Sequence, residues 1–193
     1  MILTKLKEST REQHVNLEGV VDVMNKMLTR EDYQTLIEKF YRFYSAVEPL
    51  VAANDLADSG IDLAERTKTG LLEADLEVLG ALDKVQALPV LTDVPVLDTP
   101  AKAFGAMYVM EGATLGGQVI TRHLKQHLGL TPENGGSFFN SYGHRVGPMW
   151  KDFGAAVTAF SEKTGTDDEI VGAAKETFDS FARCFAETSE ANG

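Results

Sequence analysis

The chain has 193 residues, 44% of them hydrophobic and 24% charged, which predicts one globular domain, residues 1–193, with a core of its own. Its formal net charge of −11 excludes a general nucleic-acid binder, which needs a basic surface. A single cysteine, a charged N-terminus and the lack of an apolar run near the ~20 residues of a membrane span lead us to expect a cytoplasmic protein without a disulfide.

Helical periodicity dominates the first half of the chain. Apolar residues at i, i+3 and i+4 spacing predict a first helix over residues 3–28. Thr29 and Asp32 form a capping-box pattern that begins a second helix, which we expect to end near Pro49. A third helix is expected over residues 63–82.

Prolines interrupt this pattern over residues 87–98, which we expect to form an extended loop because no partner strand appears elsewhere. Thr99 followed by Pro100 predicts the start of a fourth helix. That helix should end near Leu128, since Gly129 is a typical residue just past a helix end.

Two further helices follow a turn-rich stretch. One is expected over residues 149–163, and the last opens at Thr166 and runs past Phe185. The elements together predict an all-α fold, a single packed helical bundle.

The fourth helix contains three glycines within "YVMEGATLGGQVI": Gly112, Gly116 and Gly117. Each interior glycine costs a helix roughly 0.5–1 kcal/mol relative to alanine. Because the apolar spacing continues beyond them, the helix does not end there. Close packing of another helix and contact with a flat ligand both explain the glycines, and the pattern does not decide between them.

His14 lies on the apolar stripe of the first helix, so we expect its ring to point inward. From the spacing alone, a core histidine bonded to a neighbour is the preferred interpretation. Two features favour a ligand role instead. Glu18, one turn later, is placed to accept the second ring N–H and fix the tautomer, as in metal-bound imidazoles. Lys7 and Arg11 flank the same end of the helix and suit the propionates of a haem.

The other histidines are weaker candidates. His123 and His127 are spaced i, i+4 and could chelate a metal together, but no third ligand stands near. The last turn of a helix also favours histidine electrostatically. His123 shares a face with Gly116 and therefore competes with His14 for any ligand role. We interpret His144 as a solvated loop residue.

Three segments of the chain resemble heme oxygenases, most closely the bacterial biliverdin-producing enzymes that include those associated with bacteriophytochromes. They are "KESTREQHVNLE" (7–18), "GAMYVMEGATLGGQVITRHL" (105–124) and "SFFNSYGHRVGPMWKDF" (137–153). The resemblance covers most of the chain in order. It implies a helical bundle in which haem is sandwiched between a proximal and a distal helix.

The resemblance also implies roles for particular residues. His14 matches the proximal axial ligand of the haem iron, and Glu18 the acidic residue after it. Gly112, Gly116 and Gly117 match the distal helix, whose backbone lies over the haem and directs the reaction. The other haem contacts are a basic residue and a tyrosine at a propionate edge and two apolar rings of the last helix: Lys7, Tyr108, Phe178 and Phe181. Arg11 joins this set on the charge argument above.

The implied activity is oxygen-dependent cleavage of haem to biliverdin, carbon monoxide and iron, with haem as both substrate and cofactor and ordered water as the proton source. No flavin or nicotinamide fingerprint occurs, since "EGATLGG" lies within a helix. Electrons must therefore come from an external donor, a ferredoxin-type or flavoprotein reductant, and a bacteriophytochrome is a candidate recipient of biliverdin. We expect Lys5, Lys7 and Arg11 to form a basic patch that docks the donor.

One position departs from the family pattern. Many heme oxygenases carry an aspartate directly after the first distal glycine, where this chain has Ala113, as bacterial relatives have a small residue. Distal waters would then depend on Arg122 or Gln118. The departure keeps a non-catalytic haem sensor or carrier open as an alternative. A carboxylate di-metal oxidase would need Glu-x-x-His pairs, which this sequence lacks, and a plain helical interaction protein would use His14 and the glycines for packing only.

Overall fold

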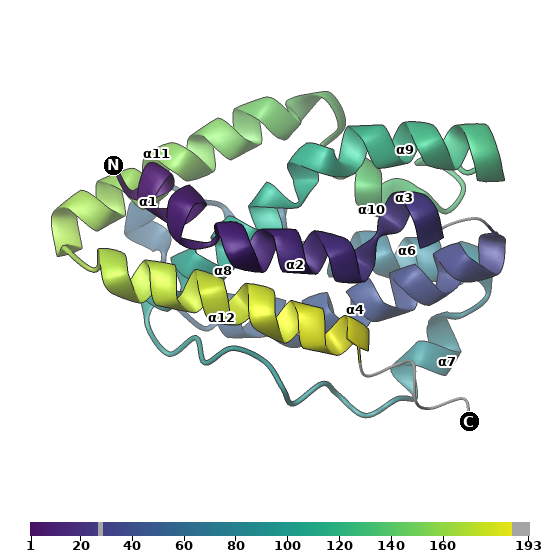
Figure 1. Cartoon of the computed structure of the whole chain (residues 1–193), viewed down its shortest axis with the longest axis horizontal. Coiled ribbons are helices and arrows are strands. Elements are labelled where there is room, and N and C mark those ends of the chain that lie inside the picture. Colours follow the sequence, from purple (N-terminus) through teal and green to yellow (C-terminus); the bar gives the residue numbers. More distant parts are fainter. Residues whose placement is uncertain (27–28, 187–193) are drawn as a thin grey trace.

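The computed structural model describes residues 1–26 and 29–186, and in these ranges the chain forms helices, turns and loops but no strand (Figure 1). This confirms the predicted all-α fold. The α-helices are α1 (Ile2–Ser9), α2 (Arg11–Val21), α3 (Val23–Lys26), α4 (Arg30–Ala52), α5 (Leu63–Arg66), α6 (Thr69–Leu79), α7 (Leu82–Gln86), α8 (Pro100–Gly112), α9 (Thr114–Leu128), α10 (Ser137–Asn140), α11 (Val146–Thr164) and α12 (Asp167–Ala186). Two short 3₁₀ helices are η1 (Ala57–Ser59) and η2 (Gly143–Arg145).

The predicted first helix is divided into α1, α2 and α3, so its continuity was wrongly predicted. Thr10 departs from helical backbone angles (φ −102°, ψ 6°), and its hydroxyl donates to the carbonyl of Leu6 at 2.8 Å. Asp22 has left-handed angles (φ 39°, ψ 50°), which aspartate tolerates better than most residues. Leu28, the end of the predicted stripe, lies outside the described residues.

The α4 helix begins with the predicted capping box. The Asp32 N–H donates to the Thr29 hydroxyl at 3.1 Å, and the Thr29 N–H donates to the Asp32 carboxylate at 2.9 Å. The helix passes Pro49 and ends at Ala52, later than predicted. Proline removes one backbone donor but fits helical φ, and burial of Val51 stabilises the extra turn.

Aromatic side chains from α4, α10 and α12 fill the centre of the bundle. Phe43 stacks on Phe181 with ring centroids 4.1 Å apart and planes 11° from parallel. Phe40 makes edge contacts with Phe181 and Phe139, at 5.4 Å and 5.5 Å. Each ring buries a large apolar area, so this cluster holds α10 and α12 against α4.

The predicted helix over residues 63–82 is divided into α5, α6 and α7. A carboxylate from another helix starts α6, since Glu48 accepts from the backbone N–H groups of Lys68 (2.6 Å) and Thr69 (3.1 Å). Gly80, with a left-handed φ of 71°, ends α6. Residues 87–98 form an extended segment, as predicted, along one edge of the bundle (Figure 1).

The predicted fourth helix consists of α8 and α9, which meet at Ala113. The hydroxyl of Thr99 caps α8 by accepting from the N–H of Lys102 at 3.2 Å, and Gly129 (φ 66°) ends α9, both as predicted. Buried α8 packs mainly on α12. The carbonyl of Ile170 approaches Gly105 so closely that a side chain at this position would overlap it.

Helices α11 and α12 close the bundle. The α11 helix begins at Val146, three residues earlier than predicted, and α12 begins one residue after Thr166 and continues past Phe185 as predicted. The α12 helix contacts both α8 and α2, and Figure 1 shows it running alongside α2. It therefore joins the buried centre of the molecule to the helix that carries His14.

Candidate functional site

His14 lies near the start of α2 with its side chain 55% exposed, so the predicted inward orientation is wrong. The prediction assumed one continuous helix from Leu3 onward. Because the helix is broken at Thr10, the angle between Leu3 and His14 is no longer that of one continuous helix. The side of α2 that packs on the bundle is therefore not the side that carries His14. The ring is accessible on one side and supported by protein on another.

Two neighbours orient the His14 ring. Its Nδ1 atom lies 3.5 Å from a carboxylate oxygen of Glu18, the partner expected from the i, i+4 spacing. The edge of the ring meets Phe178, at a centroid distance of 5.7 Å and an interplanar angle of 72°. Phe178 is itself only 5% exposed on α12. The imidazole therefore has a defined support while Nε2 stays on the side away from Glu18.

The basic residues near α2 differ in their availability. Lys7 and Arg11 are exposed. Lys5 instead pairs with Asp168 at 2.8 Å, and this hydrogen bond raises the pKa of Lys5 above its ordinary value. Asp167 lies 3.8 Å from the same ammonium group. The expected three-residue basic patch is thus reduced to Lys7 and Arg11.

Tyr108 joins α8 to the start of α2. Its hydroxyl lies near Thr10, which lowers the pKa of Tyr108 against the larger effect of burial, and its ring centroid lies 5.8 Å from that of Trp150. The side chain is half-buried, and burial raises its pKa. Phe181, also predicted to contact a haem, belongs to the central aromatic cluster and is 2% exposed, so packing alone accounts for its position.

The three glycines at the α8–α9 junction have three different environments. The carbonyl of Phe139 sits against Gly117, where any Cβ would overlap it. Gly116 is exposed, and a Cβ added there would have no other atom within 4 Å. A Cβ at Gly112 would lie 3.8 Å from the Trp150 ring. Close packing therefore explains Gly117, whereas the backbone at Gly116 is open and contact with a flat ligand there stays a prediction.

Large apolar side chains are exposed beside these positions. Leu115 and Val119 on α9 are 48% and 56% exposed, and Val15, next to His14 on α2, is 61% exposed. Both helices have their main packing partners elsewhere, since α2 packs on α12 and α9 on α10. Large exposed apolar side chains next in sequence to an accessible imidazole and to an open backbone are typical of residues that bind a partner or ligand.

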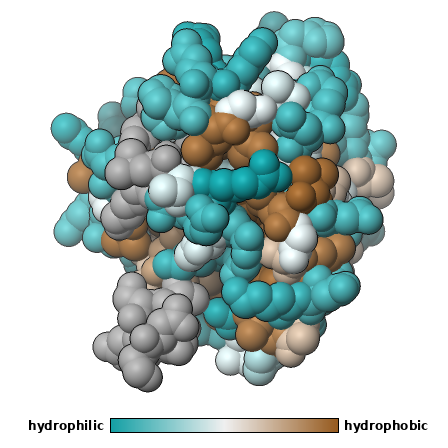
Figure 2. Space-filling model, turned by 90° about the vertical axis from the view of Figure 1, so that its right-hand side faces the viewer, coloured by the Kyte–Doolittle hydropathy of each residue, from teal (hydrophilic) through white to brown (hydrophobic). Residues whose placement is uncertain are grey.

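The end of the molecule where α9 and α3 lie also presents apolar surface. Figure 2 shows this end, with apolar side chains separated by polar ones. Short α3, which follows α2 in the chain, contacts α9 here. The two helices that carry His14 and Gly116 are thus linked at one end through α3.

A buried charged cluster precedes Gly112. Glu111 is 2% exposed and accepts hydrogen bonds from Arg66 (2.7 Å), Lys68 (3.0 Å) and the Tyr142 hydroxyl (2.7 Å). We call these four residues the Glu111 cluster. Burial lowers the pKa of Lys68 and raises that of Tyr142. Sequence reasoning missed this cluster, although one acidic residue in the apolar run "AFGAMYVMEGA" was a usable signal.

A second buried carboxylate holds α10 against α6. Asp75 accepts from the backbone N–H groups of Ser137 (2.8 Å) and Phe138 (2.9 Å), and from the Ser137 hydroxyl (2.8 Å). Burial raises the pKa of Asp75 despite these hydrogen bonds. The contact fixes the position of Phe139, whose carbonyl meets Gly117.

Alanine substitutions at the two adjacent glycines should have opposite effects on stability. Gly117→Ala is expected to lower the free energy of unfolding by about 1–3 kcal/mol, because its Cβ would press on the backbone of Phe139. Gly116→Ala should raise it by roughly 0.5–1 kcal/mol through helix propensity, since its Cβ meets no atom. Urea unfolding of the ligand-free variants measures both, and equal effects would contradict the environments described here.

The remaining histidines do not converge on a site. The rings of His123 and His127 stack with centroids 4.0 Å apart, and Nδ1 of His127 lies 3.1 Å from the carbonyl of His123. Among the described residues no group of three His, Cys, Asp or Glu side chains is placed to hold a metal ion. The buried Nε2 of His123 has no hydrogen-bond partner, and His144 is exposed in η2.

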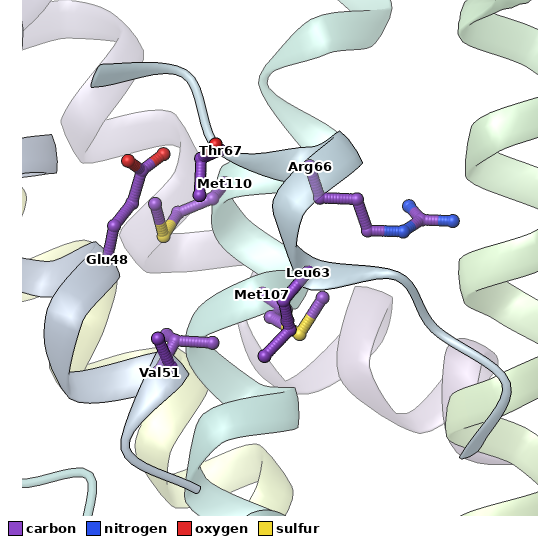
Figure 3. A pocket seen from close by; sticks show the side chains of 8 residues that line it. Glu48, Val51, Leu63, Arg66, Thr67, Met107 and Met110 are labelled. Atoms are coloured by element: carbon purple, nitrogen blue, oxygen red, sulfur yellow. The ribbon is translucent and has the colours of Figure 1, made fainter. Parts of the chain in front are cut away.

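A small cavity of about 30 Å³ lies between α4, α5 and α8 (Figure 3). Glu48 and Arg66 line it together with Met107 and Met110, and in Figure 3 the carboxylate and the guanidinium point in different directions. This volume accommodates only one or two water molecules, so the cavity is too small for a planar cofactor.

No helix in the described ranges is long and apolar enough to span a bilayer.

The chain has clear similarity to known proteins. A family model described as "Heme oxygenase" matches residues 1–187. A search of curated proteins finds no match. Heme oxygenase from Neisseria meningitidis with NO or CO bound is 21% identical, with a TM-score of 0.81, and the match covers 100% of this chain and 95% of that one. Heme oxygenase from Leptospira interrogans is 19% identical, with a TM-score of 0.75, and the match covers 96% of this chain and 98% of that one. Heme oxygenase-1 from the cyanobacterium Synechocystis in complex with heme is 20% identical, with a TM-score of 0.72, and the match covers 99% of this chain and 93% of that one. At these identities the structural matches establish the fold.

Proposed function

The chain belongs to the heme oxygenase family, and from this premise we propose that it cleaves haem with oxygen to biliverdin, carbon monoxide and iron. Haem is then both substrate and cofactor. The observation that supports this most directly is an accessible imidazole, His14, combined with a side-chain-free stretch of backbone at Gly116. The proposal extends to a cytoplasmic location.

The proximal residues fit a haem. An iron ion can bind only a ring nitrogen that no protein atom covers, and the 55% exposure of His14 meets this requirement. Glu18 lies nearest Nδ1, which favours the tautomer that presents Nε2 to the iron. Phe178 limits rotation of the ring. Lys7 and Arg11 are exposed cations that we assign to the propionates.

The distal residues fit a planar ligand as well. Leu115 and Val119 offer apolar contacts, and the missing side chain at Gly116 allows a ligand to approach the backbone. Bound haem supplies the iron that activates oxygen and the meso carbon that is oxidised. The contribution of α9 would be to keep the space beside Gly116 free of side chains, so that a small ligand has room on that side of the haem.

Proton delivery on the distal side is assigned to ordered water, because Ala113 has no acidic group. The amide nitrogen of Gln118 donates to the carbonyls of Asn140 (3.5 Å) and Gly143 (3.3 Å), so that only its oxygen is left to orient water. Exposed Arg122 is the other candidate named from the sequence. Both assignments are proposals.

Electrons must come from outside the chain. We propose a ferredoxin-type or flavoprotein reductant that docks at Lys7 and Arg11, since Lys5 is already neutralised by Asp168. A bacteriophytochrome remains our candidate recipient of biliverdin.

Reconstitution with haem tests the function. Addition of a chemical reductant in air should abolish the Soret band and give biliverdin absorption as the bound haem is consumed, and carbon monoxide should be released. A Soret band that persists under these conditions would instead indicate the non-catalytic sensor or carrier. Purified protein that binds no haem would contradict both.

A further inference from the structure

The start of the α9 helix is tied to the segment 137–143 at three points. The Tyr142 hydroxyl donates to the carboxylate of Glu111, directly before the α8–α9 junction. The carbonyl of Phe139 packs on Gly117. The amide of Gln118 donates to the carbonyl of Gly143 at 3.3 Å. These contacts reach α9 from one neighbouring segment and leave the backbone at position 116 open.

The segment 137–143 is itself held by buried groups. Asp75 binds the beginning of α10, as described above, and the Lys68 ammonium donates to the Tyr142 hydroxyl at 2.9 Å. Lys68 is 2% exposed and its ammonium also donates to the backbone carbonyl of Arg66 at 2.8 Å. The buried side of α9 is therefore fixed to α6 through this segment rather than through direct packing.

The charges of this region balance one another. Arg66 and Lys68 are two buried cations, and Glu111 and Glu48 are two buried carboxylates within their immediate surroundings. A buried charge that loses its partner is strongly destabilising, so any arrangement that separates Glu111 from Arg66 or Lys68 is disfavoured. The Thr114 hydroxyl donates to the backbone carbonyl of Glu111 at 2.7 Å, which carries this constraint into the first turn of α9.

We infer that Glu111 and Tyr142 are a positioning pair, which fixes the start of α9 and so determines how the open backbone at Gly116 lies over the substrate. The structural part of this inference concerns the ligand-free protein. The consequence for the choice of meso carbon rests on the proposed function. Neither residue is assigned contact with the substrate.

Amide hydrogen exchange on the ligand-free protein tests the structural part. Tyr142→Phe removes only a hydroxyl and should speed exchange in residues 114–122 on the order of 10-fold or more, because this hydroxyl donates to Glu111 and accepts from Lys68, both charged groups. Tyr44→Phe is the matched control, because its buried hydroxyl has no hydrogen-bond partner, and it should leave α9 unchanged. Unchanged exchange in Tyr142→Phe, or an equal increase in both variants, would overturn the inference.

A double-mutant cycle tests the charge balance. Glu111→Gln leaves the two cations with Glu48 alone and should be clearly destabilised in urea unfolding. Lys68→Met in the same chain restores neutrality and should recover part of that loss. Lys68→Met alone completes the cycle, and if Glu111→Gln does not fold, a double variant that does fold shows that the two losses are not additive. Additive losses of unfolding free energy would show that Glu111 and Lys68 do not stabilise each other.

The product of the haem-loaded variants tests the functional part. Tyr142→Phe should give a mixture of biliverdin isomers where the unmodified chain gives one predominant isomer, with haem affinity unchanged within about threefold, since the residue is not among those we assign to haem contacts. Tyr44→Phe should keep the original isomer. The same isomer from all three proteins would refute the functional part. Failure of the unmodified protein to turn over would refute the proposed function and leave the exchange result standing.

Discussion

His14→Ala is expected to abolish the native axial ligation of haem and to reduce turnover by more than about 100-fold, since even an outer partner of a metal ligand contributes 10–100-fold. The side chain is exposed, so its removal should barely affect folding. Electronic absorption of the reconstituted protein reports the ligation, and added imidazole should restore part of the activity.

His144→Ala serves as the control, because this histidine is exposed in η2, a short 3₁₀ turn. It should leave the spectrum and the turnover rate unchanged. A His14→Ala protein that keeps a histidine-ligated spectrum would contradict our assignment of the proximal ligand. His123, with its unpartnered Nε2, would then be the residue to replace next.

Gly116→Val is expected to retain haem while turnover falls on the order of 100-fold, the loss that a misplacement of about 1 Å can cause in an active site. A Cβ at this position meets no protein atom within 4 Å, so the fold should tolerate the change. The branched side chain would occupy the space where we place the substrate. Soret absorption measures retention, and biliverdin formation measures turnover.

Gly172→Val on α12 is the matched control. It is also an exposed helical glycine with no atom within 4 Å of an added Cβ, and it carries the same loss of helix propensity. Turnover should be normal in this variant. Equal rates and products for Gly116→Val and the unmodified chain would exclude a substrate over the α9 backbone.

Local signals in the sequence predicted the helix boundaries that depend on local chemistry. The capping box at Thr29, the cap at Thr99 and the left-handed end at Gly129 are all present. Each requires only a side chain and the backbone within a few residues. The breaks at Thr10 and Ala113 were not predicted, because no proline or left-handed glycine marks them and the apolar spacing continues past both.

The orientation of His14 was wrongly predicted for the same reason. An angular argument over eleven residues fails when one residue between them leaves the helical conformation, as Thr10 does. The contact with Glu18 was nevertheless anticipated, since an i, i+4 relation lies entirely within α2. The assignment of His14 as a ligand therefore depends on the family and on its exposure, and no longer on an inward orientation.

The Glu111 cluster lay beyond local reasoning. Its other members are 31 to 45 positions away from Glu111 along the chain, at the α5–α6 connection and directly before η2, and only tertiary packing brings them together. The contact of Gly117 with the Phe139 backbone is likewise tertiary. The glycine pattern indicated that something approaches α9 closely, but residue type alone does not distinguish a protein carbonyl from a ligand.

The contacts that hold α9 and its exposed surface lie on different sides of the helix. Its attachments involve positions 117 and 118, whereas position 116 and the side chain of Val119 face outward. If the chain opens haem as we propose, the iron-free product can therefore depart without rupture of these attachments. The return to the ligand-free protein should then require no refolding of α9.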